Sequence, residues 1–167
     1  NLKQGFLFGK ESLNTQYFSM YYDDTLNIKA QAELGNLLFF DPILSGNNQN
    51  ACVSCHDPSK GFTDGLAKGL AFDKTNSLPR NTPTLLNVIY QKAFFHDGRA
   101  YQLEQQIFDV VHNKSEMQSN FKDVIEKLKK DPTYQTLFHQ AFKNTSDSVI
   151  TSYAIQKAIM EYEKTLI

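Results

Sequence analysis

The sequence has no appreciable excess of charge of either sign. Its 17 lysines and arginines are balanced by 18 aspartates and glutamates, which leaves a net charge of −1 at pH 7. A chain balanced in this way offers no electrostatic footprint for nucleic acid or an anionic membrane, so we expect partners to be recognised through local contacts. Long apolar runs are also missing, and no charged and then apolar signal segment opens the chain. The sequence therefore predicts no nucleic-acid partner and no membrane span.

Cysteine is scarce as well, because the chain has only Cys52 and Cys55. A structural zinc site usually needs four Cys or His ligands, and there is no second cysteine pair to supply them. A thioredoxin-like dithiol is expected within a βαβ pattern, which is absent around these residues. Zinc and dithiol chemistry are thus disfavoured, and a disulfide is a third alternative.

What the chain does contain is the stretch Cys52-Val53-Ser54-Cys55-His56. Two thiols separated by two residues can add across the two vinyl groups of one haem, and the adjacent imidazole then reaches the iron as its proximal ligand. This spacing predicts covalent haem c with His56 as a ligand of the haem iron. At 167 residues, of which 41% are hydrophobic, the chain fits one domain with a single core around one such cofactor.

Covalent attachment also predicts a compartment, because haem is joined to this motif after export. The first residue is Asn1 rather than Met, and we therefore expect that a leader has been removed. The predicted location is the periplasm or an equivalent compartment.

The hydrophobic spacing is almost entirely helical, with apolar residues three and four positions apart over most of the chain. Between Ser45 and Pro83 it is instead rich in Gly, Asn, Ser, Asp and Pro, a composition typical of turns. A loop this long normally signals function or a wrapped cofactor. We predict an all-α, cytochrome c-like helical domain with long haem-wrapping loops. The expected helices cover residues 27–39 (capped by Asn27), part of 84–95, 101–112, about 121–130, about 132–142 and about 147–167, the last still running at Ile167.

A series of short motifs occurs in order from about Glu33 to the end of the chain. The motifs are Leu34-Gly35, Leu38 to Pro42, Leu44-Ser45, Cys52 to His56, Gly61-Phe62, Asp64, Arg80 to Leu85, Asn87, Phe95, Asp97 to Ala100 and Glu116-Met117. They resemble the N-terminal, peroxidatic haem domain of bacterial di-haem cytochrome c peroxidases and of the related MauG-type enzymes. Residues 1–30 match no pattern. We predict an unassigned N-terminal extension over 1–30 and a peroxidase-type haem domain over 31–167, with the C-terminal haem domain absent.

The resemblance implies a two-domain enzyme that reduces hydrogen peroxide to water. In the family the N-terminal haem is peroxidatic, and a C-terminal haem of higher potential receives electrons from a small cytochrome c or a copper protein. This chain has one haem motif, so it is expected to be the peroxidatic half and to be inactive in full turnover alone. A homodimeric full-length protein is a further expectation.

The resemblance also assigns catalytic roles to two residues. Glu116 matches the distal acid/base of the family, and Gln106 matches its hydrogen-bonding partner. Such an acid/base moves a proton from the inner to the outer oxygen of the peroxide. The spacing of the residues alone favours an ordinary helix-surface amide for Gln106 and a solvated loop carboxylate beside Lys114 for Glu116, and the match to the family motif reverses this preference.

Two more residues gain roles in the same way. Asn81 matches the position of a calcium ligand between the two haem domains, although it could simply cap the turn before Pro83. Arg99 could bind a haem propionate, which suits a guanidinium. An ordinary ion pair of Arg99 with Asp97 or Glu104 is the alternative.

The chain departs from the family pattern in one aromatic residue. A tryptophan usually precedes the Asp-Gly-Arg-Ala motif and is thought to lie between the two haems, but here the residue is His96 and the chain has no Trp at all. A mechanism that stores an oxidising equivalent on Trp is therefore disfavoured. We expect His96 to pack near a haem propionate.

A second departure concerns the sixth position of the iron. Many family members carry a histidine ligand in the loop after the haem motif, whereas residues 57–79 contain no His, Met or Cys, and Asp73 occupies the aligned position. Lys60, Lys68 and Lys74 would first have to lose a proton. We predict an iron that is five-coordinate or water-bound, held on the protein side by His56 alone.

Three classes of function stay open at this stage. The first is the peroxidatic domain of a di-haem peroxidase. The second is a MauG-like haem oxidase that acts on a partner protein and shares the same pocket residues. The third is a mono-haem electron-transfer cytochrome c, which predicts a six-coordinate, His/Met-ligated iron.

Overall fold

The computed structural model describes residues 25–142 and 149–167, and this part of the chain is helical, with isolated bridges in place of β-strands. The predicted all-α class is confirmed. Four short 3₁₀ turns lie between the helices: η1 (Pro42–Leu44), η2 (Cys52–Ser54), η3 (Pro58–Lys60) and η4 (Val88–Tyr90). The α-helices of the described residues are α2 (Thr25–Phe40), α3 (Leu103–His112), α4 (Phe121–Lys129), α5 (Pro132–Ala141) and α6 (Ser152–Glu163).

Helices α2 and α6 cross at the centre of the core. Leu38 of α2 and Ile155 of α6 are fully buried there. The crossing is so close that a methyl group at Gly35 would overlap the carbonyl oxygen of Ala158. A glycine is therefore required where the two backbones meet.

Side-chain caps define the later helices. Asn120 accepts a hydrogen bond from the amide of Asp123 at the start of α4, and Asp131 accepts one from the amide of Thr133 at the start of α5. Thr151 caps α6 through the amide of Ala154. Each cap satisfies an amide that the helix leaves without a partner.

Two predicted helix limits were wrong. Helix α2 begins at Thr25, so Asn27 lies within its first turn instead of capping it. Helix α6 ends at Glu163, and the chain then leaves the helix so that the carbonyl of Leu166 accepts a hydrogen bond from the amide of Asn87 at 2.6 Å. The expected start of this last helix near residue 147 falls outside the described residues.

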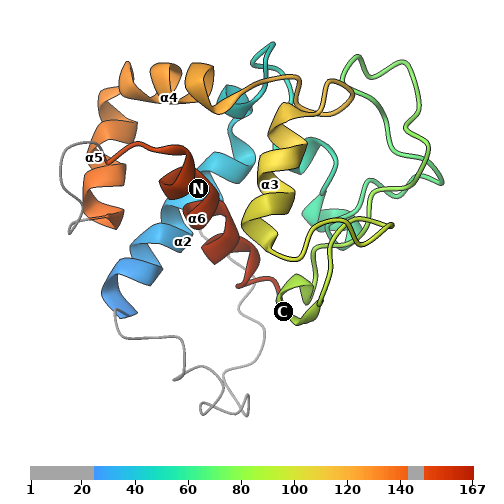
Figure 1. Ribbon diagram of the computed structural model, residues 1–167, viewed down its shortest axis with the longest axis horizontal. Helices are drawn as coiled ribbons and strands as arrows, with labels where there is room; N and C mark the ends of the chain where they lie inside the picture. Colours follow the sequence, from blue (N-terminus) through green and yellow to red (C-terminus); the bar gives the residue numbers. More distant parts are fainter. Residues whose placement is uncertain (1–24, 143–148) are drawn as a thin grey trace.

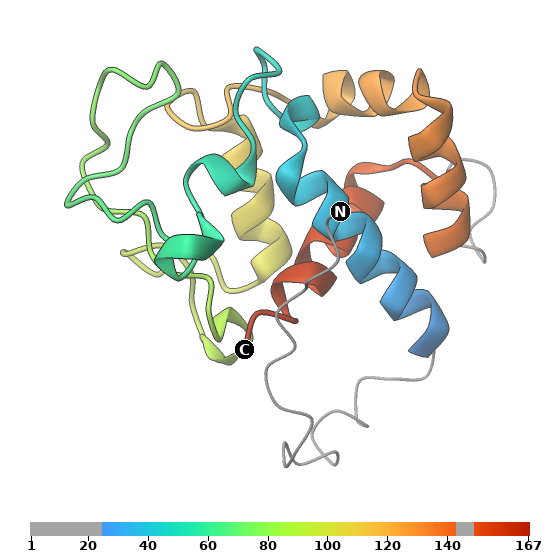
Figure 2. The ribbon, with the colours of Figure 1, turned by 180° about the vertical axis from the view of Figure 1, so that it is seen from behind.

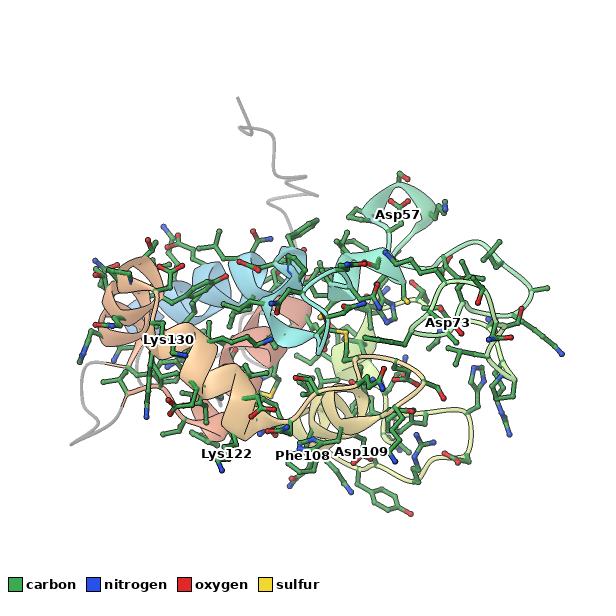
Figure 3. The ribbon with its side chains drawn as sticks, turned by 90° about the horizontal axis from the view of Figure 1, so that it is seen from above. Asp57, Asp73, Phe108, Asp109, Lys122 and Lys130 are labelled. Atoms are coloured by element: carbon green, nitrogen blue, oxygen red, sulfur yellow. The ribbon has the colours of Figure 1, made fainter. Side chains whose placement is uncertain are left out.

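Residues 45–102 contain no α-helix, and most of them form loops on one side of α3, whereas α2, α4 and α5 lie on the other side (Figures 1 and 2). Single bridges close three of these loops, between residues 57 and 63, 70 and 77, and 94 and 100. Figure 3 labels Asp57, one of the two residues whose bridge closes the first loop. The predicted irregular region is thus observed, and the short helix expected within 84–95 is η4.

The start of the loop region is tied to the turn that follows α3. The amide of Gly46 donates a hydrogen bond to the carbonyl of Met117 at 2.9 Å, and a side chain at Gly46 would overlap the carbonyl of Gln118. From α4, the Lys127 ammonium donates to the carbonyl of Ser45 at 2.8 Å. These contacts hold two segments together that lie far apart in the sequence. Within the described part of the chain, no helix is both long and apolar enough to cross a membrane.

Candidate functional site

A cavity of about 770 Å³ opens between the loops, α3 and the end of α6. This volume lies within the usual range for cofactor and small-molecule sites. Every site residue predicted from the sequence lines this one cavity. They are Cys52, Cys55, His56, Asn81, His96, Arg99, Gln106 and Glu116.

The cysteine pair enters the cavity from a tight turn. Within η2 and just after it, the amides of Cys55 and His56 both donate to the carbonyl of Cys52, at 3.1 and 2.9 Å. The Ser54 hydroxyl accepts a hydrogen bond from the amide of Ala51 at 3.0 Å and fixes the start of the turn. The spacing of the motif is therefore what brings both sulfur atoms and the imidazole to the same cavity.

The ring of His56 is oriented by a second turn. Its Nδ1 lies 3.0 Å from the carbonyl oxygen of Phe62, so Nδ1 carries the proton and donates it there. The amide of Phe62 in turn donates to the carbonyl of Asp57 at 2.9 Å. Burial lowers the pKa of His56, although the Phe62 contact opposes this shift. The imidazole is thus neutral, with Nε2 as the nitrogen left for a metal.

Both cysteines are free thiols. Burial raises the pKa of Cys52 to about 12, with a further contribution from nearby Glu163, and burial also raises the pKa of Cys55. Neutral thiols do not suit structural zinc, which binds thiolates. Among the described residues, no group of three or more His, Cys, Asp or Glu side chains could hold a metal ion. Two neutral thiols and an oriented imidazole on one large cavity fit a covalently attached haem.

Glu116 reaches the cavity from the turn that follows α3. The Asn113 side chain accepts a hydrogen bond from the amide of Ser115 at 2.9 Å, and its carbonyl accepts one from the amide of Glu116 at 3.0 Å. Glu116 is half-buried, and burial raises the pKa of its carboxyl while the charge of Arg99 opposes the shift. Gln106 is also half-buried and comes from the middle of α3. Helix and turn together bring an amide and a carboxyl with a raised pKa to the same cavity.

Three polar residues occupy exposed positions at the cavity. Nε2 of His96 lies 3.2 Å from the carbonyl oxygen of Asn81. Arg99 pairs with Asp97 at 2.9 Å, and its guanidinium lies 3.4 Å from the centre of the Phe95 ring. Of the two ion pairs considered for Arg99, the one with Asp97 is present, and Arg99 still lines the cavity.

The loop that could carry a second axial ligand offers little to a metal. Asp73 does not line the cavity, and its carboxylate accepts hydrogen bonds from the amides of Thr75 and Asn76, both at 3.0 Å. The bonds from Asn76 and then Thr75 lower the pKa of Asp73 to about 2. Within 57–79, the residues after the haem motif that line the cavity are Leu70, Ala71, Phe72, Lys74, Leu78 and Pro79.

Among the residues that sequence reasoning did not assign to the site is a buried carboxyl, Glu163 in the last turn of α6. Its side chain is 5% exposed and lines the cavity. The available signal was its position four residues after Ile159, which places a carboxyl on the buried stripe of the helix.

Comparison with known proteins agrees with this geometry. The profile of the family described as "Di-haem cytochrome c peroxidase" matches residues 29–167. The chain therefore belongs to the di-haem cytochrome c peroxidase family, whose name implies covalently bound haem c. The family resemblance read from the sequence motifs is confirmed.

Two kinds of relative are similar to the chain. It is 39% identical over 134 residues to the methylamine utilization protein MauG of Methylorubrum extorquens, covering 80% of this chain and 37% of the relative. It is 38% identical over 136 residues to cytochrome c551 peroxidase of Nitrosomonas europaea, covering 81% and 40%. The chain thus spans about two fifths of the length of these curated relatives.

Solved structures share the fold. A MauG-like protein associated with microbial copper homeostasis superposes with a TM-score of 0.77 at 22% identity, over 99% of this chain and 46% of the other. The diheme peroxidase BthA of Burkholderia thailandensis gives a TM-score of 0.68 at 24% identity, over 80% and 38%. The helical fold of the chain is therefore that of these structures.

Proposed function

We propose that this chain is the peroxidatic haem domain of a di-haem cytochrome c peroxidase. In this proposal it reduces hydrogen peroxide to water with electrons that arrive through a second haem domain. The observation that carries the proposal is the single cavity that combines the Cys52, Cys55 and His56 donor set with Glu116 and Gln106. This combination joins the means of holding a haem with an acid/base of raised pKa.

The haem would be held by thioether bonds to Cys52 and Cys55 and by Nε2 of His56. When bound, it supplies an iron that takes up peroxide at an open position. The hydrogen bond from Nδ1 of His56 to Phe62 fixes the tautomer and makes the imidazole a stronger ligand. With Asp73 engaged in its own turn, we propose an iron that has His56 as its single protein ligand.

Glu116 would act as the general acid and base of the reaction. Its carboxylate would accept a proton from one oxygen of the peroxide and donate it to the other, while the two electrons that break the O–O bond would be supplied by the haems. The amide of Gln106 would hold the peroxide or the Glu116 carboxylate in place by hydrogen bonding. Arg99 and His96, at exposed positions of the cavity, would face the haem propionates.

The remaining partners belong to the longer protein. We propose a C-terminal haem domain that accepts electrons from a small cytochrome c or a copper protein, in a periplasmic enzyme that can form homodimers. Asn81 would contribute to a calcium site shared by the two haem domains. The division of the chain at residues 30 and 31 is part of the same proposal.

A MauG-like oxidase acting on a partner protein is the second candidate. Relatives named MauG and relatives named peroxidase are equally similar to this chain, at 39% and 38% identity. An electron-transfer cytochrome c is the third, for which buried Met117 on the cavity would be the second axial ligand. These candidates differ in the ligands of the iron and in the substrate.

The test is to mature the chain in a periplasm and examine its haem. The expected result is a mass increase of one haem, no loss of haem to acid-acetone, and a predominantly high-spin ferric signal in electron paramagnetic resonance. The matched control is the chain with Cys52→Ala and Cys55→Ala, which should carry no covalent haem. A low-spin signal with nitrogen or methionine as second ligand would contradict the proposed open site. Activity of the full-length protein towards peroxide or a partner protein then separates peroxidase from oxidase.

A further inference from the structure

Glu163 is a buried carboxyl that the proposed reaction does not use. It reaches the cavity from the last turn of α6, with 5% of its surface exposed. Its Oε2 atom is buried and makes no hydrogen bond. A buried polar atom without a partner is uncommon in folded proteins and calls for an explanation.

Its neighbour Glu161 on the same helix shows what a partnered carboxyl looks like. Glu161 is 4% exposed and forms ion pairs with Lys157 at 2.7 Å and Lys164 at 3.1 Å. Among the described residues, by contrast, no Lys, Arg or His pairs with Glu163. The absence of a compensating cation favours the neutral, protonated acid.

The groups that interact electrostatically with Glu163 are Cys52 of η2 and Tyr162 of its own helix. Cys52 would no longer titrate once it carries a haem, and burial raises the pKa of Tyr162. Burial alone raises the pKa of Glu163 to about 8. Its proton would therefore be exchanged near neutral pH. The other charged or titratable residues that line the cavity come from different segments: Cys55, His56, Lys74, Arg80, His96, Asp97, Arg99 and Glu116.

We propose that Glu163 is the redox-linked proton site of this haem, binding a proton when the iron is reduced and releasing it when the iron is oxidised. One electron from the donor domain converts ferric to ferrous iron, and one proton from solvent adds to the Glu163 carboxylate. The physical basis is that a negative charge in a cavity of low polarity stabilises ferric over ferrous iron. The inference rests on the proposed haem site and adds a role that the peroxide chemistry does not require.

The test is a spectroelectrochemical titration of the haem-loaded chain at several pH values. In the wild type, the midpoint potential should fall with rising pH in a window around neutrality. The slope should approach ~59 mV per pH unit, which corresponds to a tenfold change in equilibrium constant for one electron. Glu163→Gln should have a potential independent of pH over the same window, close to the acid limit of the wild type.

Glu161→Gln is the matched control, because it removes a buried carboxyl of α6 that is paired and does not line the cavity. It should keep the slope of the wild type. A Glu163→Gln protein with an unchanged slope would overturn the proposal and point to a haem propionate or another residue.

A measurement on the wild type keeps the test valid if the variant folds poorly. The redox difference infrared spectrum should contain the carbonyl band of a protonated carboxylic acid that appears on reduction. Absence of this band would overturn the proposal. A chain that binds no haem would overturn both this proposal and the proposed function, whereas haem with a potential independent of pH would overturn this one alone.

Discussion

The helical side of the molecule and its loop side are stabilised in different ways. On the helical side, α2 and α6 interlock through fully buried side chains such as Leu34, Leu38 and Ile155. On the loop side, aspartates hold the chain through local hydrogen bonds, as Asp57 does with the amide of Ser59 and Asp73 with that of Thr75. The difference indicates that the helices supply stability and the loops supply the site.

The loop side also lacks a full core of its own. Several large hydrophobic side chains there are more than a third exposed, among them Leu66 at 46%, Leu86 at 40% and Ile89 at 39%. Leu85 and Val88 are buried, but they line the cavity. A haem in the cavity would therefore act as the missing part of the core for these loops.

The strongest test of the difference between the helical side and the loop side replaces Glu116. This residue belongs to the site and contributes nothing to the helical core. Glu116→Gln should slow the peroxide reaction of the full-length di-haem protein by about 10²- to 10⁴-fold, the usual contribution of general acid-base catalysis. The unfolding midpoint should stay unchanged. Stopped-flow kinetics and thermal unfolding measure the two effects, and wild-type rates in the variant would remove Glu116 from the mechanism.

The pH profile of the same reaction sharpens this prediction. Because burial raises the pKa of Glu116, its carboxylate forms only at a higher pH than for an ordinary glutamate. The rate should fall as the pH drops below that pKa, since the base is then protonated. Glu116→Gln should lack this acidic limb.

On the helical side, Gly35→Ala should cost about 3 kcal/mol or more of folding free energy, because the new methyl group would collide with the backbone of Ala158. Chemical denaturation of the haem-free chain measures the loss. The matched control is Ala32→Gly on the same helix, which tests helix propensity without a collision and should cost about 1 kcal/mol. A neutral Gly35→Ala variant would show that the two helices can separate slightly.

Attachment of haem should affect the two sides unequally. Amide exchange in the loop closed by the 70–77 bridge, at Ala71 and Leu78, should slow on the order of 100-fold, because the ligand stabilises the closed loop. Amides in the core of α2 and α6 should change by a few fold at most. Hydrogen exchange followed by mass spectrometry compares the haem-free and haem-loaded chains. An equal change of the exchange rates on both sides would argue against a separate stabilisation of the loop side by haem.

The smallest expected effect concerns one hydrogen-bond network of the loops. Asp64 is 9% exposed and accepts hydrogen bonds from the amide of Leu66 and the hydroxyl of Thr82, both at 3.0 Å. Asp64→Ala should destabilise the chain by about 1–2 kcal/mol, since it leaves two donors without a partner. Asp57→Ala, which removes a carboxylate that is 37% exposed, should have a smaller effect in the same unfolding assay.

The sequence predicted the helices best where an apolar stripe is combined with a cap. Helix α4 matched its predicted start at Phe121 because Asn120 caps it. The predicted end of α6 was wrong because Leu166 continues the apolar spacing of the helix. The chain has already left the helix at this point, and the carbonyl of Leu166 accepts a hydrogen bond from the amide of Asn87. The spacing of apolar residues indicates which side chains are buried. A buried side chain can belong to a helix or to a turn, so the spacing alone does not show where the helix ends.

For the site, the haem motif and the family resemblance were enough to name eight lining residues, of which seven lie in loops or turns and Gln106 lies on α3. The carboxyl of Glu163 escaped prediction, since its place on the cavity depends on how α6 crosses the rest of the fold. A residue whose environment is created by distant segments leaves no local signal in the sequence.

The bond from Gly46 to Met117 bears on which changes of chain length the protein can accept. With Lys127 anchoring Ser45, it fixes the distance between the segment leading to Cys52 and the turn that carries Glu116. An inserted residue between 46 and 52, or between 113 and 117, would shift one side of the cavity against the other. Exposed loop tips near residues 59 and 74 lie outside this constraint, so related proteins should vary in length there.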